Sequence, residues 1–140
     1  MLPLRLVLDT NIVVSAALKP AGLQRTVLLL ALTKPARLYL SPAVFAEYRA
    51  VLWRAELQIR KRLRQQLLQL LEKRAHFVVP PGSLQVTSDP PDNIFLECAD
   101  AARADYLITG NQRHFPKFWK KTKIISSREL IGIVGPHLLS

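Results

Sequence analysis

The stretch Leu4-Arg5-Leu6-Val7-Leu8-Asp9-Thr10-Asn11 decides the fold of this chain. Its first five residues are mostly apolar and do not alternate, which is typical of a short strand buried on both faces. The strand pattern ends at Asp9, and an apolar run of helical length follows it. Open α/β sheets place their chemistry at the carboxyl ends of central strands, so Asp9 is a candidate functional carboxylate. The alternative is that Asp9 or Thr10 only caps the following helix.

Strand and helix patterns alternate along the rest of the chain. The expected helices cover 11–18, 22–33, 42–53, 59–74, 92–104 and 127–134, and the expected further strands cover 37–40, 76–79, 105–109 and 123–126. Ser41-Pro42 is a strong helix start, and Ser127 is expected to cap a last helix that ends at Gly135-Pro136. This alternation of strands and helices predicts one α/β domain over residues 1–140. Helices are expected to flank a largely parallel sheet of about five strands, which gives three layers.

The composition indicates an ordered, basic protein. Lys and Arg number 20 against 10 Asp and Glu, so the net charge is +10. This excess favours a polyanion as partner, most simply nucleic acid, with an acidic protein or mere solubility as alternatives. The longest apolar run, Val27–Leu32, is too short to span a bilayer. The single Cys98 excludes an internal disulfide and a cysteine-based zinc cage, which fits a cytoplasmic location without membrane contact.

Several of the few acidic residues lie after predicted strands or in the helices between them. Asp9 follows the first strand, Glu47 lies at the margin of the third helix's apolar stripe, and Asp92 lies in the first turn of the fifth helix. Asn111 follows the fourth strand, and Glu97 lies one turn beyond Asp92. Carboxyl ends of parallel strands share one edge, so these side chains can converge there. The alternatives are that Glu47 reaches solvent and that Asp92 only stabilises its helix start.

A convergence of carboxylates has a chemical consequence. Several carboxylates cannot all ionise together without a counter-charge. Mg²⁺ or Mn²⁺ supplies it, because hard cations prefer oxygen ligands. A carboxylate-bound cation beside a basic surface suits phosphodiester hydrolysis, since the metal activates water and stabilises charge on the phosphate.

Four motifs occur in order along the chain. They are Val7–Asn11, Ser41-Pro42 followed by Glu47, Asp89–Ala99 and Ala104–Asn111. With these motifs the sequence resembles the PIN-domain nucleases, and within them the toxin components of prokaryotic toxin–antitoxin modules. The resemblance spans nearly the whole chain and implies a three-layer PIN-like fold with strand order 3-2-1-4-5. It also implies Mg²⁺- or Mn²⁺-dependent cleavage of single-stranded RNA by a homodimer that a cognate antitoxin protein inhibits.

Carried over residue by residue, the resemblance assigns roles to particular side chains. Asp9, Glu47 and Asp92 take the first three acidic positions, as catalytic metal ligands. Thr10, Asn11 and Ser41 match polar positions that support the site, and Glu97 is a further supporting candidate. The fourth acidic position is Asn111 here, and Pro91 stands where many relatives have an acid. An amide adds no negative charge, so this departure weakens the expectation of a second metal.

Basic and aromatic residues interleave after the fourth strand. The candidate RNA-binding residues are Arg113, His114, Lys117, Lys120 and Lys121. The aromatic side chains Phe115, Phe118 and Trp119 can stack on bases, or can pack under the last strand, and we expect packing for at least two of the three.

Two other functions remain open from the sequence. The first is a PIN-like module with weakened acids that binds RNA or protein without cleaving, which Asn111 and Pro91 favour. The second is an aspartyl-phosphate phosphatase, which also begins with an Asp at a strand end. Such an enzyme needs a second Asp two residues later as general acid, and Asn11 occupies that place.

Overall fold

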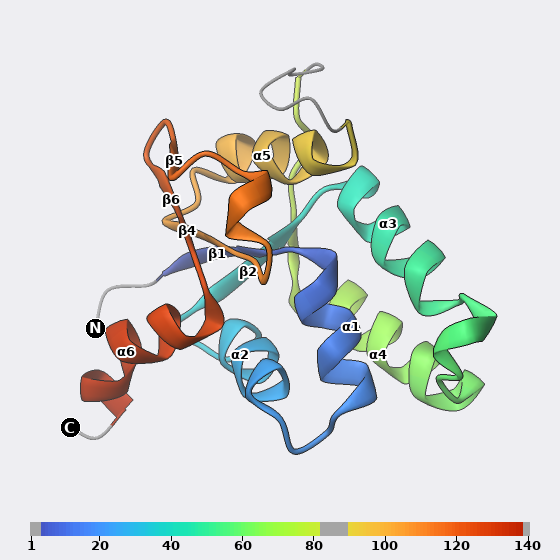
Figure 1. Ribbon diagram of the computed structural model, residues 1–140. Coiled ribbons are helices and arrows are strands. Elements are labelled where there is room, and N and C mark those ends of the chain that lie inside the picture. The colour runs from blue at the N-terminus through green and yellow to red at the C-terminus, as the bar shows by residue number, and fades with distance from the viewer. Residues whose placement is uncertain (1–3, 82–89, 139–140) are drawn as a thin grey trace.

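A central six-stranded sheet organises the computed structural model, which describes residues 4–81 and 90–138 (Figure 1). Its strands are β1 (Arg5–Leu8), β2 (Arg37–Leu40), β3 (His76–Phe77), β4 (Tyr106–Ile108), β5 (Phe118–Trp119) and β6 (Thr122–Ile125). The helices are α1 (Thr10–Leu18), α2 (Leu23–Ala31), α3 (Pro42–Leu52), α4 (Lys61–Arg74), α5 (Pro90–Ala102) and α6 (Ser127–Leu138), with 3₁₀ turns at Ala55–Leu57 (η1) and Gln112–His114 (η2).

The sheet order is β3-β2-β1-β4-β6-β5. β1 lies inside the sheet and pairs in parallel with β2 and β4, with Leu8 opposite Ile108. The five expected strands have the order 3-2-1-4-5, as the resemblance implied, with β6 as the fifth. The antiparallel strand β5 was not expected, because its two residues are too few to give a strand pattern.

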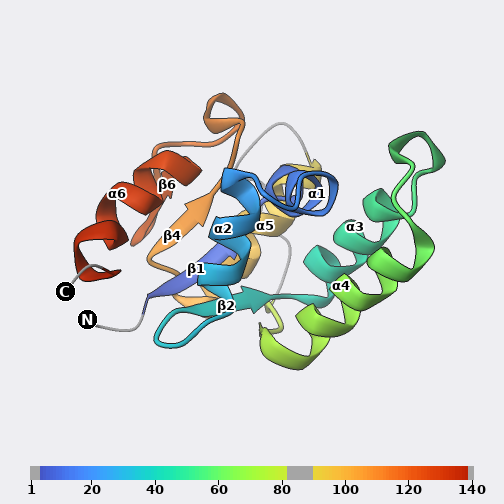
Figure 2. The same ribbon diagram turned by 90° about the horizontal axis from the view of Figure 1, so that it is seen from below.

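Helices cover both faces of the sheet. α5 packs on one face against β1, β2 and β4, while α2 lies on the other and contacts α1 and α6 (Figures 1 and 2). The pair α3 and α4 lies to one side of the sheet in both views. Leu6, Val7 and Leu8 are fully buried between these layers, which confirms the interpretation of this stretch as a two-sided strand.

Helix ends account for most differences from the sequence-based expectations. The expected helix from residue 59 begins only at Lys61, because the chain first makes the turn η1 and a left-handed Gln58 (φ 53°). α6 is capped by Ser126 rather than Ser127: the Ser126 hydroxyl accepts a bond from the Glu129 N–H (3.1 Å), and Glu129 Oε1 accepts one from the Ser126 N–H (3.1 Å). This is a capping box.

The expected end of α6 at Gly135-Pro136 was also wrong, because the helix continues to Leu138. A proline removes only one intrahelical hydrogen bond. The turn before Pro136 is held by Val134, which is 1% exposed. Across the described residues, no single helix has the length and apolar character to cross a bilayer, and α1 and α2 reach that length only together, bent by 117°.

Candidate active site

Asp9 lies at the carboxyl end of β1 and is 7% exposed. Its backbone N–H donates to the Ile108 carbonyl (2.9 Å), which continues the pairing with β4. Its Oδ1 accepts a bond from the Thr10 N–H (2.8 Å), and its Oδ2 accepts one from the Thr109 hydroxyl (2.7 Å). Asp9 is thus the N-cap of α1, as the simpler interpretation expected, but capping explains only one of its two buried oxygens.

The pKa of Asp9 is raised above its ordinary value of 3.8, and burial is the main cause. The hydrogen bonds from Thr109 and Thr10 lower this pKa, and so does the nearby His114, but together they do not offset the loss of hydration. The ionised carboxylate is therefore left with less stabilisation than it would have in water. A cation at this position would restore that stabilisation.

Thr109 connects Asp9 to the turn that follows β4. Its hydroxyl donates to Asp9 and accepts a bond from the Asn111 backbone N–H (2.9 Å). In the same turn the Gly110 N–H donates to Asn11 Oδ1 (3.3 Å), so Asn11 serves as a structural acceptor. The predicted polar residues Thr10, Asn11 and Asn111 therefore lie around Asp9.

α3 contributes a buried tyrosine beneath this edge. Tyr48 is fully buried and donates its hydroxyl to the carbonyl of Leu8, the residue before Asp9. Burial raises the pKa of Tyr48 well above its ordinary value, so the hydroxyl stays protonated as a donor. Glu47 directly precedes Tyr48 on α3 and is partly exposed. Ser41 caps α3 as expected, because its hydroxyl accepts a bond from the Val44 N–H (3.1 Å).

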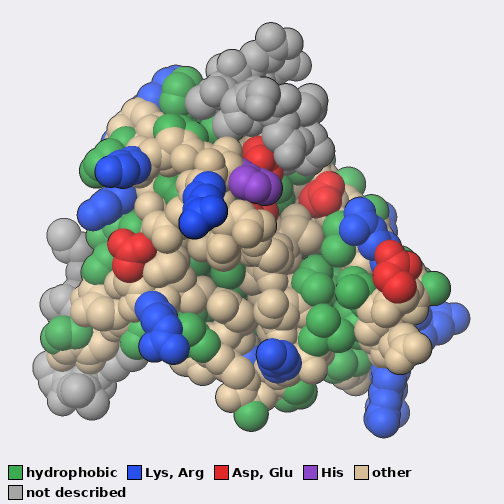
Figure 3. All heavy atoms as spheres, viewed as in Figure 1, with side chains coloured by type: hydrophobic (Ala, Val, Ile, Leu, Met, Phe, Trp, Pro, Cys, Tyr) green, Lys and Arg blue, Asp and Glu red, His purple; other side chains and the backbone are tan. Residues whose placement is uncertain are grey.

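α5 and η2 bring Asp92 and His114 together. Asp92 lies in the first turn of α5, as the sequence predicted, and its side chain is 14% exposed. Its Oδ2 is 3.7 Å from His114 Nδ1. His114 also lowers the pKa of Asp9 through its charge, so it lies near Asp9 as well as Asp92. The face of the molecule drawn in Figure 3 has acidic side chains beside a histidine.

The candidate RNA-binding residues lie between β4 and β6 and differ in their position and contacts. Arg113 and His114 belong to η2. Lys120 pairs with Asp100 (2.9 Å) and lies 5.6 Å from the Trp119 ring. Lys117 and Lys121 are exposed, and neither forms an ion pair within the described parts of the chain.

The aromatic residues of this segment follow the packing expectation. Phe115 is buried and Trp119 packs against the core, whereas Phe118 is 58% exposed. Packing for two of the three is therefore confirmed. Only Phe118 presents most of its ring to a ligand.

The residues of this edge fit a hydrated divalent cation. In residues 4–81 and 90–138, no three His, Cys, Asp or Glu side chains group closely enough to share one ion. Mg²⁺ does not need three, because it commonly takes one or two carboxylates and completes its shell with water and substrate phosphate. Asp9 and Asp92 supply hard oxygen donors of this kind. The Thr10 hydroxyl is also buried without a hydrogen-bond partner in the described residues, so a metal-bound water would satisfy it.

Fold and site together define an α/β protein with a buried carboxylate, Asp9, at the carboxyl edge of a mostly parallel sheet, and with a pair formed by Asp92 and His114. A family model described as PIN domain matches residues 5–113. The chain therefore belongs to the PIN-domain family, whose members are generally nucleases that use divalent metals. No curated protein matches the sequence.

A solved structure supports the fold. The chain is similar to one in the crystal structure of VapBC2 from Rickettsia felis bound to a DNA fragment from their promoter. The TM-score is 0.63 at 19% sequence identity, and the match covers 88% of this chain and 98% of that one.

Two residues at this site had no assigned role in the sequence analysis. Thr109 follows β4, and the pairing of Leu8 with Ile108 places it beside Asp9. The register of the two strands was the signal that could have identified it. Tyr48 follows Glu47 in the predicted third helix, and the requirement of a buried tyrosine hydroxyl for a hydrogen-bond partner was the signal that could have identified its contact.

Proposed function

We propose that this protein is a divalent-metal-dependent endoribonuclease that cleaves single-stranded RNA and acts as the toxin of a toxin–antitoxin pair. The observation that carries the proposal is the buried carboxylate of Asp9, with its raised pKa, near His114, which in turn lies 3.7 Å from Asp92. This is an arrangement in which a carboxylate needs a cation and a phosphodiester can supply the remaining ligands. Membership of the PIN-domain family supports the same chemistry.

Asp9 and Asp92 hold Mg²⁺ or Mn²⁺ in this proposal. When bound, the cation supplies Lewis-acid stabilisation of the phosphate and lowers the pKa of a bound water. The Thr109 hydroxyl donates to Asp9 and lowers its pKa, which favours the ionised form that binds a cation. Glu47 is a further ligand or orients the attacking water, and Asn111 holds a metal-bound water, with Glu97 as an additional acid on α5.

Of the proposed RNA contacts, Arg113 and His114 belong to η2 beside Asp92, whereas Lys120 and Lys121 precede β6 at the opposite edge of the parallel sheet. Arg113, His114, Lys117 and Lys121 bind phosphates, and Phe118 stacks on a base. Lys120 contributes less because Asp100 already neutralises its charge. The net charge of +10 supports a polyanionic substrate.

The regulatory part of the proposal concerns an antitoxin. VapBC2 of Rickettsia felis, a structural neighbour over nearly its whole chain, was crystallised with promoter DNA. By analogy, we propose that a cognate antitoxin inhibits this protein, which acts as a cytoplasmic homodimer. Co-expression with the adjacent open reading frame, followed by co-purification, tests this part separately.

Cleavage of a labelled single-stranded RNA tests the activity directly. We expect products with Mg²⁺ or Mn²⁺, none with EDTA, and none from an Asp9→Asn variant prepared identically. Asn keeps the side chain's size and its capping ability, so the variant is a matched control. Cleavage that persists in EDTA or in the variant would show a contaminating nuclease or another site, and the proposal would be wrong.

A second candidate is a binding module that does not cleave. It is favoured by Asn111, which is exposed and adds no negative charge. This alternative predicts RNA binding without products and without any effect of Mg²⁺ on thermal stability. Either a cleavage product or a Mg²⁺-dependent rise in Tm that Asp9→Asn abolishes argues against it.

A further inference from the structure

A second concave surface lies at the opposite edge of the sheet from Asp9. A pocket of about 830 Å³ is formed by the end of α2, the turn before β2, the end of α4 and the start of β3. β2 and β3 are parallel to each other and to β1, so their first residues share the amino-terminal edge. The residues proposed for catalysis take no part in its lining. We call this surface the amino-edge pocket.

The amino-edge pocket is strongly basic. Its lining includes the four cationic side chains Lys34, Arg37, Lys73 and Arg74, together with His76, and contains no Asp or Glu. All five side chains are exposed. In the parts of the chain that the structure describes, none of the five forms an ion pair. A concave surface with one sign of charge concentrates the field and attracts anions.

Stabilisation of a helix end accounts for only two of the four Lys and Arg side chains in the pocket. Lys73 and Arg74 lie in the last turn of α4, where cations stabilise the free carbonyl groups. Lys34 and Arg37 have no such role, since Lys34 lies beyond the end of α2 and Arg37 is the first residue of β2. Both side chains are exposed and have no ion pair among the described residues, so their charges are available to an external anion.

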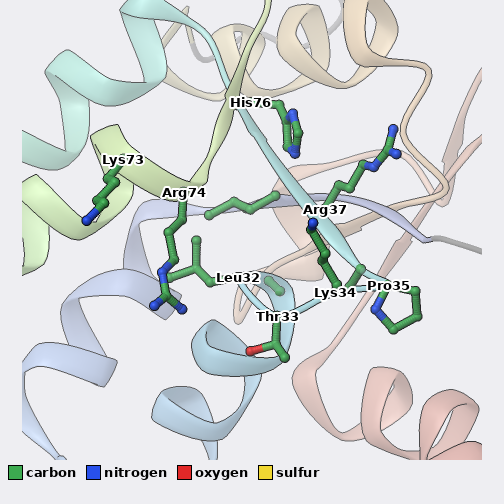
Figure 4. Close-up of a pocket in the computed structure, with 11 residues that line it drawn as sticks. Leu32, Thr33, Lys34, Pro35, Arg37, Lys73, Arg74 and His76 are labelled. Atoms are coloured by element: carbon green, nitrogen blue, oxygen red, sulfur yellow. The ribbon is translucent and has the colours of Figure 1, made fainter.

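The arrangement of the cations indicates an extended anion rather than a compact one. Figure 4 shows Lys73 and Arg74 on one side of the pocket, Lys34 near the middle, and Arg37 and His76 on the other side. Lys73 and Arg37 point outward at the two ends, so the charges form a row. A single phosphate needs converging donors, whereas a row suits successive phosphates of a nucleic-acid strand.

The space between the cations is apolar. Leu32, Pro35 and Leu38 lie in the lining, and the His76 ring is exposed with Tyr39 5.4 Å away on one side. Sugars and bases of a nucleic acid can contact such a surface, and a base can stack on an exposed imidazole. An acidic peptide would match the charges, but unlike a nucleic acid it does not carry an aromatic ring for every negative charge.

We propose that the amino-edge pocket binds the backbone of single-stranded RNA, as a contact separate from the carboxylate site. The inference rests on the proposed function for the choice of RNA among polyanions. The volume of the pocket lies in the range of specific ligand sites.

Binding without cleavage tests the proposal. The affinity of a fluorescent single-stranded RNA is measured by anisotropy in EDTA for the wild type, for Lys34→Glu with Arg74→Glu, and for Lys19→Glu with Lys61→Glu. Lys19 and Lys61 are exposed and lie outside the pocket lining, so the second variant has the same net charge as the first. A milder pair, Lys34→Gln with Arg74→Gln, covers the case in which the glutamates impair folding.

We expect the pocket variant to bind about tenfold more weakly than the charge-matched control, with a salt dependence reduced by about 1.4 in log–log slope for two lost phosphate contacts. Photo-crosslinks from 4-thiouridine RNA should map to peptides containing residues 31–38 or 73–76. Equal affinities of the two glutamate variants, no binding by the wild type, or displacement of an acidic peptide but not of RNA by the pocket substitutions would overturn the proposal. Loss of the proposed nuclease function would instead appear as no cleavage with Mg²⁺ while binding in EDTA is retained.

Discussion

Asp9 has two physical roles that oppose each other. It caps α1, which stabilises the fold, and it buries a carboxylate, which costs stability when that carboxylate is ionised. Because the pKa of Asp9 is raised in the folded state, that state holds a proton which the unfolded chain has already released. Stability therefore falls as pH rises from 3.8 through the folded pKa, and the full cost is present at neutral pH.

The first prediction concerns Asp9→Asn. Without metal, the Tm of the variant at neutral pH should equal or exceed that of the wild type, because the uncompensated charge is removed while the cap is kept. Its RNA cleavage should fall about 10²- to 10⁴-fold, the equivalent of several kcal/mol of metal-based stabilisation. Mg²⁺ should raise the Tm of the wild type alone. A lower Tm for the metal-free variant at neutral pH would contradict this account.

The second prediction concerns the hydroxyl of Thr109. That hydroxyl donates to Asp9 and lowers its pKa, so Thr109→Val should raise the pKa of Asp9 further. More Asp9 is then protonated at any given acidic pH, and the acid limb of the kcat/KM profile should move to higher pH. Thr109→Ser keeps the donor and is the matched control. An unchanged acid limb in Thr109→Val would mean that another group controls it.

At the scale of elements, the hairpin of β5 and β6 offers an internal comparison between adjacent lysines. Lys120 pairs with Asp100, whereas Lys121 is exposed and has no ion pair among the residues described. We predict that Lys121→Gln reduces the salt dependence of RNA binding by about 0.7 in log–log slope, as for one lost phosphate contact. Lys120→Gln should change it less, because Asp100 already neutralises that charge. A larger effect at Lys120 would contradict this interpretation of the hairpin.

Local signals in the sequence located some elements better than others. Ser41-Pro42 predicted the start of α3 correctly, because a cap and a first-turn proline act within a few residues. β5 was missed because its pairing with β6 comes from a tight turn rather than from an apolar pattern. The end of α6 was placed too early because proline was weighed without the packing of Val134. The local turn therefore decided the first case, and tertiary packing decided the second.

The candidate site also shows this difference between local signals and contacts distant in sequence. Asp9 and Asp92 could be proposed from the sequence because a strand end and a helix start fix their positions. The contacts of Thr109 with Asp9 and of Tyr48 with Leu8 join segments 100 and 40 residues apart. Such contacts depend on register and packing, which a single sequence does not display.

At the scale of the whole molecule, the charge of +10 should govern how tightly RNA binds but not the chemistry. We predict a linear fall of log affinity with log salt, by about tenfold or more between about 50 and about 200 mM if three or more phosphates are contacted. The slope should be the same for the wild type and Asp9→Asn in EDTA. Salt-insensitive binding would mean that the basic surface serves another purpose.

In the turn after β4, the charge of the side chain at position 111 is independent of the backbone hydrogen bond that residue 111 makes. Residue 111 reaches Thr109 through its main-chain N–H, while its own side chain points to solvent-accessible space and takes no part in that bond. Replacing Asn111 with Asp would thus add one negative charge and would keep the hydrogen bonds from residue 111 to Thr109 and from Thr109 to Asp9. If the proposed function holds, the charge available to a second cation can therefore be changed at position 111 without changing the hydrogen bonds that hold Asp9.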